Sequence, residues 1–352
     1  MIKKVLKIAQ VAPLEESVPP IKYGGTELVI SNLTEELVHR GHHVTLLAAG
    51  DSKTRATLLP VFKKSIRQEP DGQDLDKRNA LKFIGVARVV DYLQKNHFDI
   101  IHNHLGWRLL PFSDSLPAPI VTTLHGPLDI GYQRFVYGQY PAAAYVTISK
   151  SQRRAMPHLN FVGTVYNGID VAAFDFSAKP GRYLAFLGRM SPEKGPIEAI
   201  MAAKKAKLPL IMAAKIDVVD KPYFAQRVKP LIDGKQIKFI GEVNHQGKVK
   251  LLKNALALLA LIQWEEPFGL FMVEALACGT PVIATRRGSV SEIIQAGKTG
   301  FIVKDYREAA STIKKIGQIN RRICRLTAEK RFTTEIMADG YEKIYRRRLG
   351  RK

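Results

Sequence analysis

Short apolar runs alternate with helix-like stretches along most of the chain, and this alternation limits the possible folds more than any other feature. In the first half, the apolar runs lie at residues 5–11, 44–49, 100–103, 120–124, 145–148 and 164–166. Residues 26–40 and 77–95 lie between such runs, and their apolar side chains recur on one helical face. Strands that alternate with amphipathic helices form a parallel sheet covered on both faces. The sequence therefore predicts an α/β fold with doubly wound sheets.

The pattern restarts after a polar stretch at residues 175–182. Further apolar runs lie at residues 183–188, 208–213, 237–240, 257–262, 281–284 and 300–303, with helix patterns at residues 246–254 and 271–278. We predict two Rossmann-like domains, which suits 352 residues. The first spans residues 1–174 and is completed by a C-terminal helix at residues 331–352, and the second spans residues 175–330. Ligands of such sheets bind at the carboxyl ends of the strands, so we expect the loops to line an interdomain cleft.

Cysteine content and hydropathy bear on the compartment. The two cysteines, Cys278 and Cys324, have no spacing typical of a disulfide framework or a zinc site, which fits a reducing cytoplasm. No apolar run reaches the ~18 residues that a membrane span requires. We therefore expect a cytoplasmic protein whose contact with a membrane, if any, is peripheral.

The charge is strongly basic and unevenly distributed. Lys and Arg number 54 against 32 Asp and Glu, for a formal net charge of +22. Residues 1–170 carry 20 basic and 15 acidic side chains, whereas residues 171–352 carry 34 and 17. Such a field favours nucleic acid, anionic lipid headgroups or phosphorylated ligands, and a merely solvated basic surface is the alternative. The basic tail at residues 346–352 suits peripheral contact with an anionic inner membrane face.

The most informative motif is WEEPFGLFMVEALACGTP at residues 264–281. It places Glu266 eight positions before Glu274, after an apolar run and around a glycine-containing loop that leads into a helix. The start of a helix presents free backbone N–H groups and a positive dipole end, which suit phosphate or sugar oxygens. Carboxylates beside that loop can bind hydroxyl groups. The alternative is that both glutamates are solvated residues of a helix start.

Two further loops carry candidate phosphate ligands. LGRMSPEKG at residues 187–195 puts Arg189 and Lys194 on one loop, where two cations can neutralise a diphosphate. In YGGTE at residues 23–27, Gly24 and Gly25 allow close backbone approach before a helix. The dinucleotide fingerprint GxGxxG is absent there, which argues against a dehydrogenase.

Histidines follow two of the predicted strands. His125 comes directly after the run at residues 120–124 and precedes a glycine, a position that points it toward the predicted cleft. The pair His102 and His104 lacks neighbouring carboxylate or cysteine ligands, so we predict packing and cleft lining rather than a metal site. No Ser-His-Asp or Cys-His arrangement is recognisable.

The string EPFGLFMVEALACGTPVIA resembles the E-x7-E signature of glycosyltransferase family 4, retaining nucleotide-sugar transferases of GT-B architecture. The resemblance extends over essentially the entire chain. Other matching segments follow in order: YGGTE at 23–27, DIIHNH at 99–104, TLHGP at 123–127, TISK at 147–150, NGID at 167–170 and LGRMSPEKG at 187–195.

The resemblance implies that the second domain binds the donor. Glu266 and the backbone of Phe268, Gly269 and Leu270 would hold the donor sugar hydroxyls and the diphosphate. Glu274 would bind the ribose hydroxyls.

The same resemblance assigns Arg189 and Lys194 to the diphosphate and places Gly24 and Gly25 beside it. His125 would contact the donor sugar near the reacting carbon. The first domain would then be the acceptor side.

The implied reaction is transfer of a sugar, with retention, from a nucleotide-diphosphate sugar to a glycan, lipid or small-molecule acceptor, such as a precursor of a cell-surface glycoconjugate. The departing phosphate helps to deprotonate the acceptor. The nucleotide sugar is a co-substrate, and we expect neither a cofactor nor a metal ion. Two alternatives remain at this point. One is an epimerase or hydrolase of the same fold, and the other is a basic nucleic-acid-binding protein, which only the net charge supports.

Overall fold

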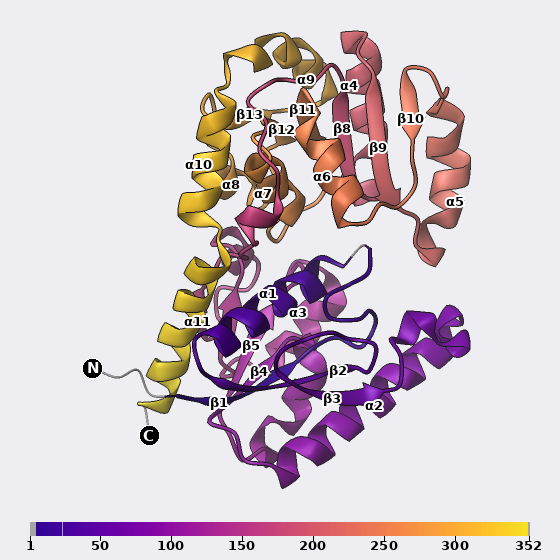
Figure 1. Cartoon of the computed structure of the whole chain (residues 1–352). Coiled ribbons are helices and arrows are strands. Elements are labelled where there is room, and N and C mark those ends of the chain that lie inside the picture. Colours follow the sequence, from indigo (N-terminus) through magenta and orange to yellow (C-terminus); the bar gives the residue numbers. More distant parts are fainter. Residues whose placement is uncertain (1–4, 23, 351–352) are drawn as a thin grey trace. The chain divides into compact units, whose positions relative to one another are not determined.

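The computed structural model of the chain describes residues 5–22 and 24–350 (Figure 1). The chain divides into two compact units. One is formed by the chain up to Gly168 together with the chain from Thr334 onward, and the other by Ile169–Thr333. Residues 169–174, which the sequence pattern placed in the first domain, belong to the second unit. Tyr23 of the YGGTE segment and the last two residues of the basic tail lie outside the described residues.

The first unit is built on a seven-stranded sheet in which all strands are parallel. The strand order is β3-β2-β1-β4-β5-β6-β7, so the order reverses between β1 and β4. The strands are β1 (Lys7–Val11), β2 (His43–Ala49), β3 (Thr57–Phe62), β4 (Ile100–Asn103), β5 (Ile120–Leu124), β6 (Tyr145–Thr147) and β7 (Phe161–Thr164). The reversal creates a switch point at the carboxyl ends of β1 and β4, where doubly wound sheets bind ligands.

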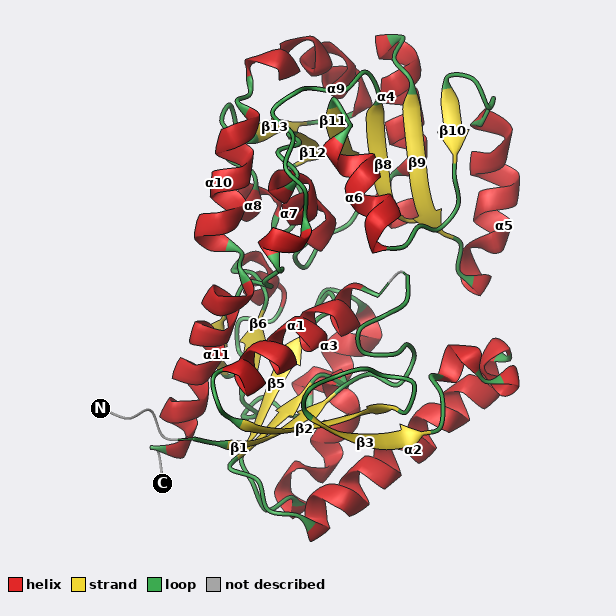
Figure 2. Cartoon of the chain, in the orientation of Figure 1, coloured by secondary structure: helices red, strands yellow, loops and turns green. Residues whose placement is uncertain are grey.

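Helices cover both faces of this sheet (Figure 2). The helices are α1 (Gly25–His39), α2 (Leu75–Lys95), α3 (Gly131–Gly138) and α11 (Thr334–Leu349). Val89 of α2 belongs to the buried cluster around Leu47 of β2, whereas Ile30 of α1 belongs to the cluster around Leu46. Because successive strand residues point to opposite faces, α1 and α2 cover opposite sides.

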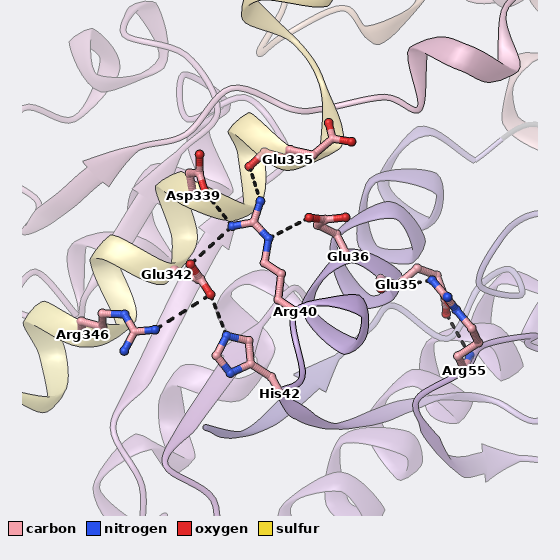
Figure 3. Close-up of polar contacts among 9 residues, drawn as sticks. All are labelled: Glu35, Glu36, Arg40, His42, Arg55, Glu335, Asp339, Glu342 and Arg346. Atoms are coloured by element: carbon pink, nitrogen blue, oxygen red, sulfur yellow. Dashed lines mark hydrogen bonds and ion pairs between the residues drawn. The ribbon is translucent and has the colours of Figure 1, made fainter. Parts of the chain in front are cut away.

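An ion-pair network ties α11 to α1 (Figure 3). The Arg40 guanidinium donates to Glu36 Oε1 at 2.7 Å, to Asp339 Oδ1 at 2.6 Å and to Glu342 Oε2 at 3.3 Å. His42 Nε2 lies 2.7 Å from Glu342 Oε1, and His42 Nδ1 accepts a hydrogen bond from a backbone N–H. Glu342 is therefore buried between partners on three sides, since Arg346 of the same helix also lies within 4.0 Å of it. Arg346 belongs to the basic tail and is thus engaged in this network.

The second unit contains a six-stranded parallel sheet in the order β10-β9-β8-β11-β12-β13. Its strands are β8 (Leu184–Arg189), β9 (Leu210–Lys215), β10 (Ile237–Phe239), β11 (Ala257–Ala260), β12 (Val282–Thr285) and β13 (Gly300–Val303). Its helices are α4 (Pro196–Ala206), α5 (Lys221–Tyr223), α6 (His245–Lys253), α7 (Leu270–Ala277), α8 (Val290–Ile293), α9 (Tyr306–Thr312) and α10 (Arg321–Arg331). The order reverses between β8 and β11, which places a second switch point there.

The predicted fold class is confirmed, and the differences concern the sheet edges and the C-terminus. Strand β3 was not predicted, and β7 lies at residues 161–164 rather than 164–166. Both are edge strands with mostly half-buried residues, and β3 contains Pro60, so neither has a continuous apolar run. The C-terminal segment was expected to be one helix from residue 331, but α10 ends at Arg331 and α11 begins at Thr334. In the described part of the chain, every helix is too short or too polar to cross a bilayer.

We predict that Arg40→Ala lowers the free energy of unfolding by about 2 kcal/mol, because it leaves the buried Glu342 carboxylate without its main charged partner. Arg55→Ala is the matched control. Arg55 pairs with Glu35 at a site where its side chain is 64% exposed, so its loss should cost less than about 1 kcal/mol. Urea denaturation followed by circular dichroism measures both values. Equal losses in the two variants would contradict the anchoring role of the network.

Candidate functional site

The carboxyl ends of β8 and β11 bring two motifs of the sequence together in the second unit. These strands are adjacent in the sheet, with Ala257 opposite Leu184. The loop after β8 contains a short 3-10 turn, Pro192–Lys194, and the loop after β11 leads into α7. The Gln263 N–H donates to the carbonyl of Glu193 at 2.8 Å, so the two loops are directly linked. The switch point of this sheet therefore carries the predicted donor-site motifs.

A buried ion pair joins these loops. Lys194 Nζ lies 2.6 Å from Glu266 Oε2, and the indole N–H of Trp264 donates to the same oxygen at 2.9 Å. Lys194 Nζ also lies 4.8 Å from the centre of the Trp264 ring and 5.5 Å from that of Phe271. The Lys194 and Glu266 side chains are only 11% and 7% exposed. Burying two charges is costly unless they are paired, so this geometry fixes both side chains in place.

Gly269 starts α7 and has a left-handed backbone, with φ of +81°. L side chains rarely adopt this conformation, and a Cβ here would also lie 2.4 Å from the terminal methyl of Met272, so both observations favour glycine. No side chain caps the helix, which leaves N–H groups of the first turn for other acceptors. Phe268 is buried, and its carbonyl accepts a hydrogen bond from Ser289 at 2.6 Å, while Leu270 is the first helical residue.

Glu274 lies farther along α7, and its carboxylate forms a short ion pair with Lys248 of α6. Both side chains are largely buried. The sequence pattern identified Glu274 but not Lys248. Nothing distinguishes Lys248 from the other lysines of this basic half until the fold brings α6 beside α7.

Arg189 ends β8 but contacts different partners from Lys194. Its guanidinium pairs with Glu193, and its Nε lies 3.2 Å from Asp220 Oδ2. Burial raises the pKa of Asp220, although Arg189 opposes this shift. Burial also acts to raise the pKa of Glu193. Hydrogen bonds and the Arg189 charge outweigh this effect and hold the Glu193 pKa below its usual value. Arg189 at the end of β8 and Lys194 in the loop that follows therefore each lie beside an acidic residue.

The remaining predicted residues belong to the first unit. Gly24 caps α1, and a Cβ there would lie 2.7 Å from Pro20 Cβ, so the packing excludes larger residues. Gly25, in contrast, faces open space, since no atom lies within 4 Å of a Cβ built on it. The backbone at Gly25 is therefore accessible to a ligand.

His125 lines a cavity of about 310 Å³ at the carboxyl ends of β1, β4 and β5. Leu14, His104 and Trp107 also line it. Removal from bulk water lowers the pKa of His125 to about 4, so the imidazole is neutral at physiological pH. Among the described residues, no group of three or more His, Cys, Asp and Glu side chains is arranged to hold a metal ion, and this includes the pair His102 and His104.

Glu27 also lines this cavity and was not singled out by the sequence pattern. It lies in the first turn of α1 and is 7% exposed. Burial raises its pKa to about 7, and the nearby Glu16 and Glu15 add to the shift while Arg67 opposes it. A second acid at the cavity, Glu15, pairs with Lys82 at 2.6 Å. The cavity therefore offers charged, neutral and titratable groups within one hollow.

Comparison with known proteins agrees with this arrangement. Residues 23–173 match the sequence model of glycosyltransferase family 4, and residues 173–322 match that of glycosyl transferases group 1. The chain is 26% identical to the N-acetyl-alpha-D-glucosaminyl L-malate synthase of Bacillus anthracis, a match that covers 92% of this chain and 93% of that protein. It is also 26% identical to the phosphatidyl-myo-inositol mannosyltransferase of Mycolicibacterium smegmatis, over 85% of this chain and 81% of that protein.

Solved structures share the whole fold. AviGT4, a glycosyltransferase involved in avilamycin A biosynthesis, superposes with a TM-score of 0.74 at 24% identity and 99% coverage of both chains. HepE of Anabaena, in complex with UDP-glucose, has a TM-score of 0.74 at 18% identity and covers 97% of this chain and 99% of its own. Because the two family models together span residues 23–322 and both units have the expected parallel sheets, the chain belongs to glycosyltransferase family 4 and is an enzyme with the GT-B fold.

Proposed function

We propose that this glycosyltransferase binds a nucleotide-diphosphate sugar at the carboxyl ends of β8 and β11 and transfers the sugar, with retention, to an acceptor hydroxyl. The observation that carries the proposal is the buried pair of Lys194 and Glu266 beside the uncapped start of α7. HepE, which shares the fold, binds UDP-glucose.

The two parts of such a donor need different partners. A diphosphate is an anion, and the Lys194 ammonium is a cation at the carboxyl end of β8 that can interact with its oxygens. The backbone N–H groups after Gly269 and the Arg189 guanidinium add positive potential. Sugar hydroxyls, in contrast, donate to carboxylates. We assign Glu266 to the sugar and Glu274 to the ribose of the nucleoside.

The proposed transfer conserves atoms and charge without a further reactant. The bond between the sugar C1 and the phosphate oxygen breaks, and a bond between C1 and the acceptor oxygen forms on the same face. The acceptor proton moves to an oxygen of the departing phosphate. Negative charge grows on the diphosphate in the transition state, where Lys194 and Arg189 stabilise it most.

The cavity of the first unit supports the acceptor side of the proposal. Its volume suits a compact polar molecule or the head of a larger one. Glu27, with a pKa of about 7, can donate or accept a hydrogen bond near neutral pH. We propose that a hydroxylated acceptor binds there.

Calorimetric titration with UDP-, GDP- and ADP-sugars identifies the donor base, and two variants then separate the roles of the glutamates. Glu266→Gln should weaken binding of the nucleotide sugar about tenfold and should not weaken binding of the free nucleoside diphosphate, because it removes the carboxylate that accepts from the sugar while the Lys194 ammonium, its former ion-pair partner, remains available to the diphosphate. Glu274→Gln should weaken binding of both ligands about tenfold. Glu329→Gln, on the exposed face of α10, is the control and should change neither. Identical effects of the two site variants on both ligands would contradict the assignment.

Lys194→Ala should lower kcat for sugar transfer by about 100-fold or more, because it removes a cation from the leaving group in the transition state. Lys253→Ala removes an exposed ion pair with Asp175 in the same unit and should leave kcat unchanged. Melting temperatures of both variants establish that they fold. A folded Lys194→Ala protein with the turnover of the wild type would rule out this role, and an inverted anomeric centre in the product, read by NMR, would rule out retention.

The Glu27 carboxyl gives a prediction for stability. Its pKa in the folded protein, about 7, is above the ordinary 4.5, so between these values the folded state holds a proton that the unfolded state has lost. The free energy of unfolding should therefore fall by up to about 3 kcal/mol as the pH rises from 4.5 to 7. Glu27→Gln should remove this dependence on pH. Compared with the wild type at the same pH, the free energy of unfolding of Glu27→Gln should therefore be relatively higher at pH 8 than at pH 5. Urea denaturation at both pH values tests this, with Glu335→Gln as an exposed control, and parallel curves for Glu27→Gln and the wild type would refute it.

A further inference from the structure

Three side chains from neighbouring strands of the first unit form a continuous hydrogen-bonded line beneath the cavity. Gln10 of β1 places its Oε1 atom 2.8 Å from His104 Nε2. His104 Nδ1 lies 2.8 Å from His125 Nε2. Gln10 is fully buried, His104 is 4% exposed, and His125 reaches the cavity. The line thus runs from the core of the sheet to the candidate site.

The direction of each hydrogen bond in this line follows from the carbonyl at its buried end. With the Gln10 amide oriented as in the structure, its oxygen accepts from His104, so the proton is on His104 Nε2. A neutral imidazole carries one N–H, which leaves a lone pair on His104 Nδ1. His125 Nε2 must then donate to that lone pair, and the free lone pair of His125 is on Nδ1.

Both rings are neutral in the folded protein, which this assignment requires. Burial holds the pKa of His104 well below its ordinary value, and the neighbouring imidazoles His102 and His125 shift it in the same direction. Burial alone lowers the pKa of His125 to about 4.

A second hydrogen-bonded group, centred on His102, packs against the His104 ring. The His102 and His104 rings lie with their centres 4.0 Å apart. His102 Nδ1 is 2.6 Å from the Tyr345 hydroxyl, and His102 Nε2 is 2.7 Å from Thr123 Oγ1, which in turn is 3.0 Å from the Tyr341 hydroxyl. Both tyrosines belong to α11 and are fully buried. The C-terminal helix thereby fixes the His102 ring, which packs against His104.

We propose that Gln10 and His104 are positioning residues that hold His125 in the Nε2–H form, so that its Nδ1 accepts a hydrogen bond from a substrate hydroxyl and disfavours an anionic oxygen. The proposal rests on the proposed function only in identifying that hydroxyl as part of the sugar or the acceptor. A site that accepts from a hydroxyl discriminates strongly against a ligand without one, because its lone pair is then left unpaired.

The direct test is the tautomer itself, read from long-range ¹H–¹⁵N correlations of the full chain with ¹⁵N-labelled histidine at pH 7. The His125 signals are identified by their loss in His125→Asn. The proposal predicts a pyridine-like Nδ1 and a pyrrole-like Nε2 for both His125 and His104. A pyrrole-like Nδ1 in His125, or an equal mixture of tautomers, would overturn it, since the Gln10 amide would then be turned or without influence.

A variant pair tests whether Gln10 is the cause. Gln10→Met keeps a similar volume but removes the acceptor, and it should give mixed tautomers at His125 with kcat lowered about tenfold and nucleotide-sugar affinity changed less than about twofold. Thr164→Val is the control. It removes the hydrogen bond between Thr147 and Thr164 in the same sheet and should leave the His125 signals and kcat unchanged. An unchanged His125 tautomer in folded Gln10→Met would refute the role of Gln10, and if that variant does not fold, the wild-type spectrum still decides the proposal.

The outcome also separates this inference from the proposed function. If His125 has the predicted tautomer but the protein binds no nucleotide sugar, the positioning role stands and the donor assignment is wrong. If the protein transfers the sugar but His125 has the opposite tautomer, the donor assignment stands and the positioning role is wrong.

Discussion

The buried contact between Lys194 and Glu266 is the interaction on which the donor-binding half of the molecule depends. Two charges at this depth are tolerated only when each is the partner of the other, so the loops after β8 and β11 must meet. Two glycines make that meeting possible. Gly195 has φ of +69° and a Cβ there would lie 2.0 Å from the carbonyl oxygen of Leu261, while Gly269 turns the chain into α7. The pair therefore couples backbone geometry to the chemistry of the switch point.

The first unit meets a different requirement, because burial shifts the pKa of two of its candidate groups toward the uncharged form. These two groups, His125 and Glu27, lie at one cavity. The helix that completes this unit, α11, is fixed at its surface through Arg40 and contributes buried tyrosines beneath the cavity. Its attachment is thus part of the site's construction as well as of the fold.

Much of this could be predicted from the sequence, and the rest depended on tertiary neighbours. Buried parallel strands have continuous apolar runs, and this is why the central strands and the fold class were recognised while the edge strands β3 and β7 were missed or displaced. Glu266 and Lys194 were identified by local motifs. Lys248, the partner of Glu274, has no local signal, and the alignment of Gln10 with His104 depends on strand register and not on spacing along the chain.

A crystal structure of the full chain bound to whichever of UDP, GDP or ADP binds most tightly tests the central claim most directly. The account predicts that the diphosphate lies within hydrogen-bonding distance of Lys194 Nζ and of the backbone N–H groups at the start of α7, with the ribose hydroxyls on Glu274. A diphosphate bound elsewhere, with the contact between Lys194 and Glu266 unchanged and no ligand beside it, would contradict the account.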